Sequence, residues 1–367
     1  MSLTASVPLL HETTEIDADW VGAVLADAFP GVEVRGVTCR PIGAGNVSDT
    51  VHVGIDYATR PPGAPDAVVA KFRPRSPEVH QHGLGSGAYH REIGGYRAIT
   101  ERAACRIPHL FHVAGDETNI NLVVEDLTAA TPGNQVAGCG PAEAAAVLTQ
   151  LARLHGTFSP VDPATAPAWP IRMAEAADYW TPMVRTGSAT ALTRYRDRLS
   201  ADDLEIVAAA SELAHEWHLL PQTRLTLTHG DPRVDNVLFE QADGAVRAVL
   251  IDWQVTGLRN PMYDVGYFLS GSLTVADRRE HEDRLLRHYL AEYAVVDPGY
   301  PVEEAVEDYR TQVMSGLMIT TAAIAVLPDV EQVNTLILAL LERNCAAVAD
   351  RGAVEAVRAR RVPEQRR

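Results

Sequence analysis

The first third of the chain alternates apolar and polar residues in the way that β-strands do. Three such runs, VEVRGVTCRPI, TVHVGI and AVVAKF, lie within residues 32–72 and are separated by stretches that contain glycine and proline. A two-residue period bounded by turn residues predicts strands, whereas helical spacing of the apolar residues predicts helices over 16–29 and 86–103. Residues 119–127, NINLVVEDL, predict a further strand that leads into a polar turn. These patterns predict a small sheet with a helix beside it.

Beyond Leu127 the apolar residues recur mainly at helical spacing. Residues 141–156 place Leu148 and Leu151 on one face, with Pro141 as a helix start. The same spacing predicts helices over 171–198, 201–219, 273–293, 301–326 and 329–350. A β-hairpin over 237–252 interrupts this series, and the basic tail 351–367 is expected to fray. The change of pattern predicts an α+β chain with a small antiparallel-sheet N-lobe, residues 1–126, and a larger, mainly helical C-lobe, residues 127–367.

Composition places the chain among ordinary globular proteins, with 46% hydrophobic and 22% charged residues. The formal net charge of −16 argues against a nucleic-acid partner, because a phosphate backbone requires a basic surface. The most apolar stretch, residues 313–327, is shorter than the roughly 20 residues that span a bilayer, so it predicts a buried helix and no membrane partner. The four cysteines are scattered and the N-terminus lacks a signal-peptide pattern, so a cytoplasmic location is expected.

Residues 228–254, THGDPRVDNVLFEQADGAVRAVLIDWQ, carry the strongest chemical signal of the chain. Folding this hairpin about Asp243–Gly244 brings Asn236 and Asp252 to within a residue of facing each other. Facing residues of an antiparallel pair lie about 5 Å apart at Cβ. Asp231 lies just before the hairpin and adds a second carboxylate. A carboxamide and a carboxylate that converge beside a free base predict a Mg²⁺ site with a base nearby.

The same segment resembles the Brenner motif of the aminoglycoside phosphotransferase/choline kinase superfamily, with HGDPRVDN followed by IDW. Together with VVEDL, REIGGY and IDWQ, these motifs look most like the ecdysteroid-kinase-like branch, over roughly residues 40–290. Protein kinases share the layout HRDxxxxN and DFG, but this chain has Gly230 and Trp253 in place of the arginine and the phenylalanine, and it lacks an A-P-E element. The resemblance implies a protein-kinase-like two-lobe fold. It also implies an ATP- and Mg²⁺-dependent phosphotransferase that acts on a small-molecule hydroxyl, with GTP as an open alternative nucleotide.

The resemblance implies a role for each matching residue of the catalytic segment. Asp231 would accept the proton of the acceptor hydroxyl and orient that hydroxyl for in-line attack. Asn236 and Asp252 would hold Mg²⁺. His229 would brace the catalytic loop, and Asp264, in NPMYDVGYFL, resembles the buried carboxylate that supports this loop in the family.

Lys71 is the only lysine in a chain with 32 lysine and arginine residues. Codon bias is one explanation. The other is that the site needs a compact ammonium, which a wide guanidinium cannot replace between phosphate oxygens. AVVAKF occupies the strand on which kinase-like enzymes place the lysine that contacts the α- and β-phosphates, and this favours the second explanation. Glu92 is the implied ion-pair partner, with Glu78 and Glu101 as alternatives on the same segment.

Two further segments are implied to contact the nucleotide. PIGAGNVSDTVHV, residues 41–53, is predicted to offer backbone N–H groups and a hydroxyl to the phosphates from Gly45, Asn46, Val47 and Ser48. By resemblance, adenine would pair with the Glu125 carbonyl and the Leu127 N–H, with Val124 as gatekeeper. GLGSG, residues 83–87, follows no strand and is therefore predicted to be a flexible lead-in to a helix.

The motifs identify the phosphoryl donor and leave the acceptor open. Residues 171–198 and 309–345 lie outside the shared motifs and are expected to line the acceptor site. The candidate residues there are Asp178, Tyr179, Trp180, Met314 and Met318. Because these stretches are poor in converging carboxylates, they favour an apolar or neutral hydroxylated acceptor over a polycationic aminoglycoside. A solvated or capping role is expected for His215 and His218, which lack a third metal ligand.

Three alternative functions stay open. The chain could be a nucleotide-binding pseudoenzyme or regulator, an aminoglycoside-resistance kinase, or a protein kinase. The intact set of Lys71, Asp231, Asn236 and Asp252 argues against the first, because a pseudoenzyme usually lacks one of these residues.

Overall fold

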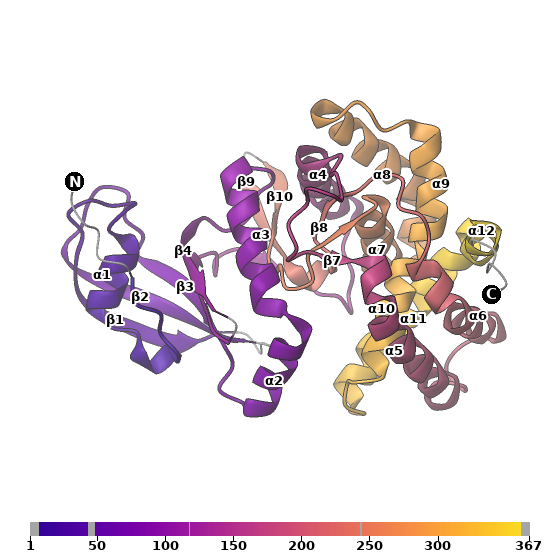
Figure 1. Ribbon diagram of the computed structural model, residues 1–367, viewed down its shortest axis with the longest axis horizontal. Helices are drawn as coiled ribbons and strands as arrows, with labels where there is room; N and C mark the ends of the chain where they lie inside the picture. The colour runs from indigo at the N-terminus through magenta and orange to yellow at the C-terminus, as the bar shows by residue number, and fades with distance from the viewer. Residues whose placement is uncertain (1–6, 43–47, 117, 243, 361–367) are drawn as a thin grey trace. The chain divides into compact units, whose positions relative to one another are not determined.

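The computed structural model describes residues 7–42, 48–116, 118–242 and 244–360 (Figure 1). Its contacts divide the chain into two compact units. The sheet unit comprises residues 1–103, 107–130 and 252–254, and the helical unit comprises 104–106, 131–251 and 255–367. The predicted α+β class, with a small antiparallel sheet and a larger helical part, is confirmed. The predicted boundary lies at residue 127, whereas the contacts change after residue 130 and also place residues 252–254 in the sheet unit.

The sheet unit is built on a five-stranded antiparallel sheet in the order β1-β2-β3-β5-β4. Its elements are η1 (Thr13–Glu15), α1 (Ala18–Leu25), β1 (Glu33–Pro41), β2 (Asp49–Thr59), β3 (Ala67–Phe72), α2 (Pro77–Ser86), α3 (Ala88–Arg102), β4 (Leu110–Gly115) and β5 (Ile120–Glu125). Trp20 of α1 packs against Phe72, and both belong to the core on one face of the sheet. Since side chains alternate along β3, Lys71 points to the opposite face.

The helical unit consists of nine α-helices within its described residues, together with two small sheets (Figure 1). Its helices are α4 (Pro141–Phe158), α5 (Met173–Arg194), α6 (Ala201–His218), α7 (Met262–Ser272), α8 (Val275–Val296), α9 (Val302–Gln312), α10 (Met314–Ile324), α11 (Glu331–Arg351) and α12 (Ala353–Arg360). Its remaining elements are β6 (Thr131–Pro132), β7 (Ile171–Arg172), β8 (Thr226–Thr228), η2 (Val234–Asn236), β9 (Val237–Ala242), β10 (Ala245–Leu250) and β11 (Gly257–Arg259). The strands form the sheets β10-β9-β6 and β7-β11-β8.

The predicted hairpin is present. Ala242 pairs with Ala245, so two residues connect β9 to β10, and of these Gly244 is described, with a φ of 77°. At the other end Val237 pairs with Leu250, and the Ile251 N–H then donates to the Asn236 carbonyl over 3.1 Å. Asp252 therefore follows directly after Ile251, the last residue of the hairpin that is hydrogen-bonded to the opposite side.

Three predictions of local structure are wrong. The GLGSG segment is the end of α2 and not a flexible lead-in, and Gly87, with a φ of 69°, separates α2 from α3. Residues 301–326 form two helices that meet at Val313, where the backbone lies against Gly266 of α7. Residues 353–360 of the expected frayed tail form α12, whose Val357 is fully buried.

Among the described residues, no helix combines the length and the apolar character needed to cross a membrane.

Candidate active site

In the sheet unit, Lys71 lies between two carboxylates. Its Nζ is 2.5 Å from Glu92 Oε1 and 3.6 Å from Asp252 Oδ1. Glu92, on α3, is 1% exposed, so this pair is shielded from water, whereas the alternative Glu101 is exposed. Burial alone would lower the pKa of the Lys71 ammonium, but Asp252 and Glu92 outweigh burial and raise this pKa. Lys71 is therefore a fixed positive charge at neutral pH.

Asp252 has an unusual backbone for a residue other than glycine. Its φ is 67°, in the left-handed region that aspartate tolerates better than most residues. The segment is also held two residues later, where Arg91 Nε of α3 donates to the Gln254 carbonyl over 2.5 Å. The Asp252 side chain is 38% exposed, and no hydrogen bond to its Oδ1 is found among the described residues. Apart from the Lys71 ammonium 3.6 Å away, this carboxylate oxygen has no partner among the described residues, so it has capacity for a further cationic ligand.

Of the other residues predicted to contact the nucleotide, Val124 and Glu125 lie in β5, whereas Ser48 and Leu127 lie just outside the strands. Ser48 is 5% exposed, and Gly45, Asn46 and Val47 lie outside the described residues. Val124 is buried on β5 opposite Val69 of β3. The Glu125 N–H donates to the His109 carbonyl over 2.8 Å, and Leu127 accepts a hydrogen bond from Ala130 N–H. The roles of these residues toward adenine and phosphate stay predictions.

In the helical unit, Asp231 is oriented by hydrogen bonds to both carboxylate oxygens. The Tyr267 hydroxyl donates to Oδ1 over 2.7 Å, and Asn236 Nδ2 donates to Oδ2 over 3.1 Å. Arg233 Nε lies 3.4 Å from the same Oδ2. Asn236 Nδ2 also donates to the Asp231 carbonyl over 2.9 Å, so its carboxamide oxygen points away from Asp231 and is the atom left for a ligand.

A buried network fixes the loop that carries Asp231. Asp264, on α7, accepts hydrogen bonds from the backbone N–H groups of His229 and Gly230, over 2.6 Å and 2.9 Å. His155 Nε2 lies 2.9 Å from the same carboxylate, and its Nδ1 pairs with the Tyr289 hydroxyl. Burial acts to raise the pKa of Asp264, but its hydrogen bonds, with His155 first, outweigh burial and lower this pKa. His229 Nε2 is bound in turn to the Ile251 carbonyl, so the loop is tied to the end of the hairpin.

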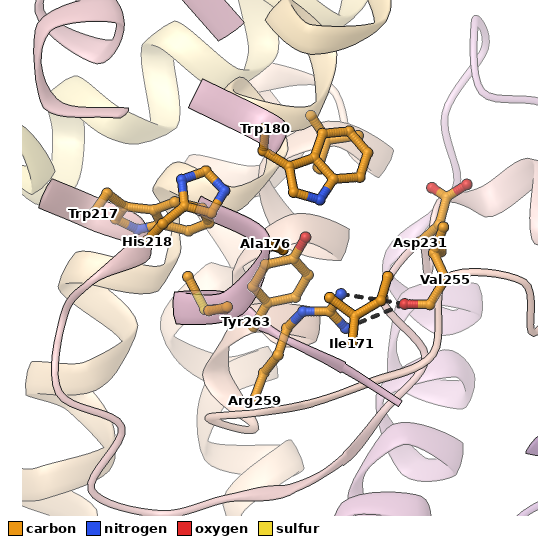
Figure 2. A pocket seen from close by; sticks show the side chains of 12 residues that line it. Ile171, Ala176, Trp180, Trp217, His218, Asp231, Val255, Arg259 and Tyr263 are labelled. Carbon is orange, nitrogen blue, oxygen red and sulfur yellow. Dashed lines mark hydrogen bonds between the residues drawn. The ribbon is translucent and has the colours of Figure 1, made fainter. Parts of the chain in front are cut away.

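A pocket opens beside Asp231 within the helical unit (Figure 2). It contains about 480 Å³ of space, part of it open to solvent. Its lining is mainly aromatic and aliphatic: Ile171, Met173, Ala176, Trp180, Trp217, His218, Gly230, Asp231, Val255, Arg259, Tyr263 and Ile319. Figure 2 shows Asp231 across the pocket from Trp217 and His218, with Tyr263 and Arg259 between them.

Of the residues expected to line an acceptor site, Trp180 lies in the pocket. The side chain of Asp178 is fully exposed and that of Tyr179 is half exposed, and neither lines the pocket. Met314 and Met318 are buried in α10, and Ile319 from that helix lines the pocket instead.

Five pocket residues were not anticipated: Trp217, His218, Val255, Arg259 and Tyr263. Of the two roles expected for His218, solvation is wrong, since the residue is 5% exposed, whereas capping agrees with the structure, in which its Nδ1 bonds to the Ala214 carbonyl in the last turn of α6. Burial lowers the pKa of His218 to about 4, so it is neutral at physiological pH. Tyr267, which contacts Asp231, was also missed. Its place three residues after Asp264 on a helix, and so on the same face, is the signal that could have found it.

The small antiparallel sheet unit, the larger helical unit and the loop from His229 to Asn236 are the features of a kinase-like phosphotransferase. Residues 38–304 match the model of the phosphotransferase enzyme family (APH), and the chain belongs to this family. The match is to the family as a whole, so the branch within it stays a prediction.

Three proteins illustrate what the chain resembles. A stretch of 61 residues is 44% identical to acyl-CoA dehydrogenase family member 10 of Mus musculus, but it covers 16% of this chain and only 6% of that protein. The structure of choline kinase from Cryptosporidium parvum Iowa II superposes with a TM-score of 0.54 at 14% identity, over 92% of this chain and 98% of that one. The GDP complex of aminoglycoside 2'-phosphotransferase-IIIa gives 0.50 at 14% identity, over 90% and 98%. At these identities the two structures show a shared fold.

Proposed function

We propose that the chain is an ATP- and Mg²⁺-dependent O-phosphotransferase, with a small hydroxylated molecule bound in the pocket beside Asp231. The observation that carries the proposal is the Asp231 carboxylate, which Tyr267 and Asn236 orient at the edge of an aromatic pocket within the helical unit. A carboxylate with this support can accept a hydrogen bond from an acceptor hydroxyl, align its oxygen and take its proton. Membership of a phosphotransferase family and the GDP complex of a structural relative support a nucleotide as the phosphoryl donor.

Taken separately, each unit holds residues that suit a nucleotide bound with Mg²⁺: Lys71, Glu92 and Asp252 in the sheet unit, and Asn236 in the helical unit. Lys71 offers a protonated, compact cation to phosphate oxygens, and Glu92 keeps this cation in place. Asp252 offers a carboxylate oxygen, and Asn236 offers a carboxamide oxygen whose amide nitrogen is already used. These are the oxygen ligands that Mg²⁺ prefers. When bound, Mg²⁺ would neutralise the charge that develops on the transferred phosphoryl group.

The test compares Asp231→Asn with the wild-type chain. We expect ADP formation, measured by a coupled assay over a panel of hydroxylated compounds, to fall about 10²–10⁴-fold, because a positioned general base contributes this much. Nucleotide affinity measured by calorimetry should stay within about threefold, since Asp231 is not among the proposed nucleotide or metal ligands. Asp197→Asn, the same change at an exposed acid outside the pocket, is the control. Turnover near the wild-type value in Asp231→Asn would show that Asp231 is not the base.

A further inference from the structure

Arg259 is a buried cation whose partners are all neutral. It is 4% exposed, at the end of β11. Its Nη1 donates to Thr228 Oγ1 over 2.9 Å, and Nη1 and Nη2 both donate to the Val255 carbonyl, over 3.3 Å and 3.2 Å. The guanidinium lies 4.6 Å from the centre of the Tyr263 ring. Among the described residues, no carboxylate lies within ion-pair distance of Arg259.

Other arginines of the helical unit show that this is a meaningful difference. The buried Arg278, at 1% exposure, pairs with Glu282 and Asp350. The partly buried Arg224, whose side chain is 15% exposed and stacks on a tyrosine as Arg259 does, pairs with Asp297 over 2.9 Å. Arg343 also has no acid partner among the described residues, but three backbone carbonyls receive its hydrogen bonds and it lines no described pocket. Arg259 alone among these four combines burial, a missing counter-charge and a place in the pocket wall.

The charges of the pocket lining are few. Arg259 and Asp231 are the arginine and the carboxylate residue of this lining. Burial lowers the pKa of His218 to about 4 and raises the pKa of Tyr263 to about 12, so both side chains are neutral near pH 7. The remaining walls are apolar, from Met173, Trp180 and Ile319. At the Arg259 end of the pocket, a cationic group would therefore meet a buried arginine without a counter-charge, whereas an anionic group would neutralise it.

We propose, resting on the function proposed above, that the acceptor is an anion: its hydroxyl lies at Asp231, its body packs against Trp180, and a carboxylate or phosphate oxygen binds Arg259. This keeps the apolar body of the acceptor expected from the sequence, but replaces the expected neutral charge with a negative one. It differs from the choline of the structural relative, which is a cation.

A purely structural role is the competing explanation for Arg259. A Cβ built at Gly257 would lie 2.3 Å from Arg259 Nη1, and one at Gly230 would lie 2.9 Å from it, so the guanidinium packs closely on the loop. A structural role predicts that ligand charge does not matter, and ligand charge can be varied without any mutation.

The test is a calorimetric titration of the wild-type chain with four matched alcohols, with and without Mg²⁺ and a non-hydrolysable ATP analogue. The probes are 4-(hydroxymethyl)benzoate, 4-(hydroxymethyl)benzylphosphonate, the methyl ester of the benzoate, and 4-(hydroxymethyl)benzylamine. We expect at least one anion to bind about 10- to 100-fold more tightly than the ester and the amine, as a charge-assisted hydrogen bond would give. The better of the two anions identifies the carboxylate or the phosphate class.

Variants then assign the effect to Arg259. The preference for the anion should be lost in Arg259→Gln, persist in part in Arg259→Lys, and stay unchanged in Arg224→Gln, which removes a partly buried, tyrosine-stacked arginine outside the pocket. If Arg259→Gln does not fold, the proposal is tested by the order of affinities of the four probes for the wild-type chain and by the anion preference of Arg259→Lys. Equal or tighter binding of the ester or amine, no anion binding at millimolar concentration, or an unchanged preference in folded Arg259→Gln would overturn the proposal. A chain that binds the ATP analogue without preferring the anion contradicts this inference alone, whereas a chain that binds no nucleotide contradicts the proposed function.

Discussion

Tyr267→Phe is expected to lower turnover while leaving nucleotide and acceptor binding unchanged. The substitution removes one oxygen, which donates the 2.7 Å hydrogen bond to Asp231 Oδ1. Within the described residues this is the shortest polar contact of the Asp231 side chain and the one that reaches Oδ1, since Asn236 and Arg233 both approach Oδ2. Without it the carboxylate can rotate about its remaining partners and presents Oδ1 to the acceptor less often.

The magnitude follows from the kind of bond that is lost. A hydrogen bond to a charged group contributes about 1.5–3 kcal/mol. If turnover requires the orientation that this bond maintains, kcat falls about 10- to 100-fold. The cost to stability is smaller, about 1 kcal/mol or less, because the Asp231 side chain is 24% exposed and water replaces part of the bond. The phenylalanine ring also keeps the packing of a residue that is 8% exposed.

The assay measures kcat and KM for ADP formation, nucleotide affinity and urea unfolding on the same preparations. Tyr300→Phe is the matched control, because the Tyr300 hydroxyl donates to Asp308 over 2.8 Å, is similarly buried and does not touch Asp231. It should lose stability and keep kcat. The reasoning is refuted if Tyr267→Phe turns over within about twofold of wild type, or if Tyr300→Phe loses as much activity.

Three further outcomes are expected. Lys71→Arg should keep the unfolding midpoint and lose about 10-fold or more in turnover, because a guanidinium is too wide for the space that the ammonium occupies; full activity would favour codon bias. Asp264→Asn should lower the free energy of unfolding by about 2–4 kcal/mol at pH 7. The pKa of Asp264 is lowered in the folded chain, so its stabilisation is present above about pH 4 and is lost as the pH falls through the folded pKa. In urea unfolding, the free energies of the wild-type chain and Asp264→Asn should therefore become equal in acid. Gly187→Ala should lower the free energy of unfolding by about 1–3 kcal/mol, since its Cβ would lie 1.7 Å from the Thr321 carbonyl oxygen. Gly22→Ala, whose Cβ would have its nearest neighbour 3.9 Å away, should raise the free energy of unfolding by up to about 1 kcal/mol in the same urea assay.

Local signals were sufficient where the chain carries strong start, stop and turn residues. Residues 141–156 are predicted as a helix and α4 spans Pro141–Phe158, because Pro141 and the Glu143 side chain both favour a helix N-terminus. The hairpin is placed equally well, because two residues that favour a tight turn separate its apolar runs. By contrast, the break at Val313 has no local signal. It lies where the backbones of α7 and α9 approach at Gly266, a contact between segments far apart in sequence.

The contrast between local sequence signals and contacts of distant segments also applies to the candidate site, where it separates the catalytic residues from the pocket wall. Asp231, Asn236 and Asp252 fall in one contiguous motif, so spacing along the chain is enough to identify them. Two aromatic residues of the pocket wall are Trp217 from α6 and Tyr263 from α7. Both are at most 3% exposed, so each could equally well be an ordinary core residue of its helix. No periodicity distinguishes a buried aromatic residue that borders a cavity from one that does not.

Helix α10 shows why tertiary packing determines the acceptor surface. Its residues are apolar on nearly every side, so the sequence does not indicate whether Met314, Met318 or Ile319 faces the acceptor. The face of α10 that borders the pocket depends on its packing against α5. The two helices approach so closely that a Cβ at Gly187 of α5 would lie 1.7 Å from the Thr321 carbonyl oxygen of α10. This contact sets the rotation of α10 against α5, and thereby places Ile319 beside Trp180 in the pocket wall. The wall of the proposed acceptor site therefore depends on a glycine that does not line the pocket, and the catalytic motif contains no information about that glycine.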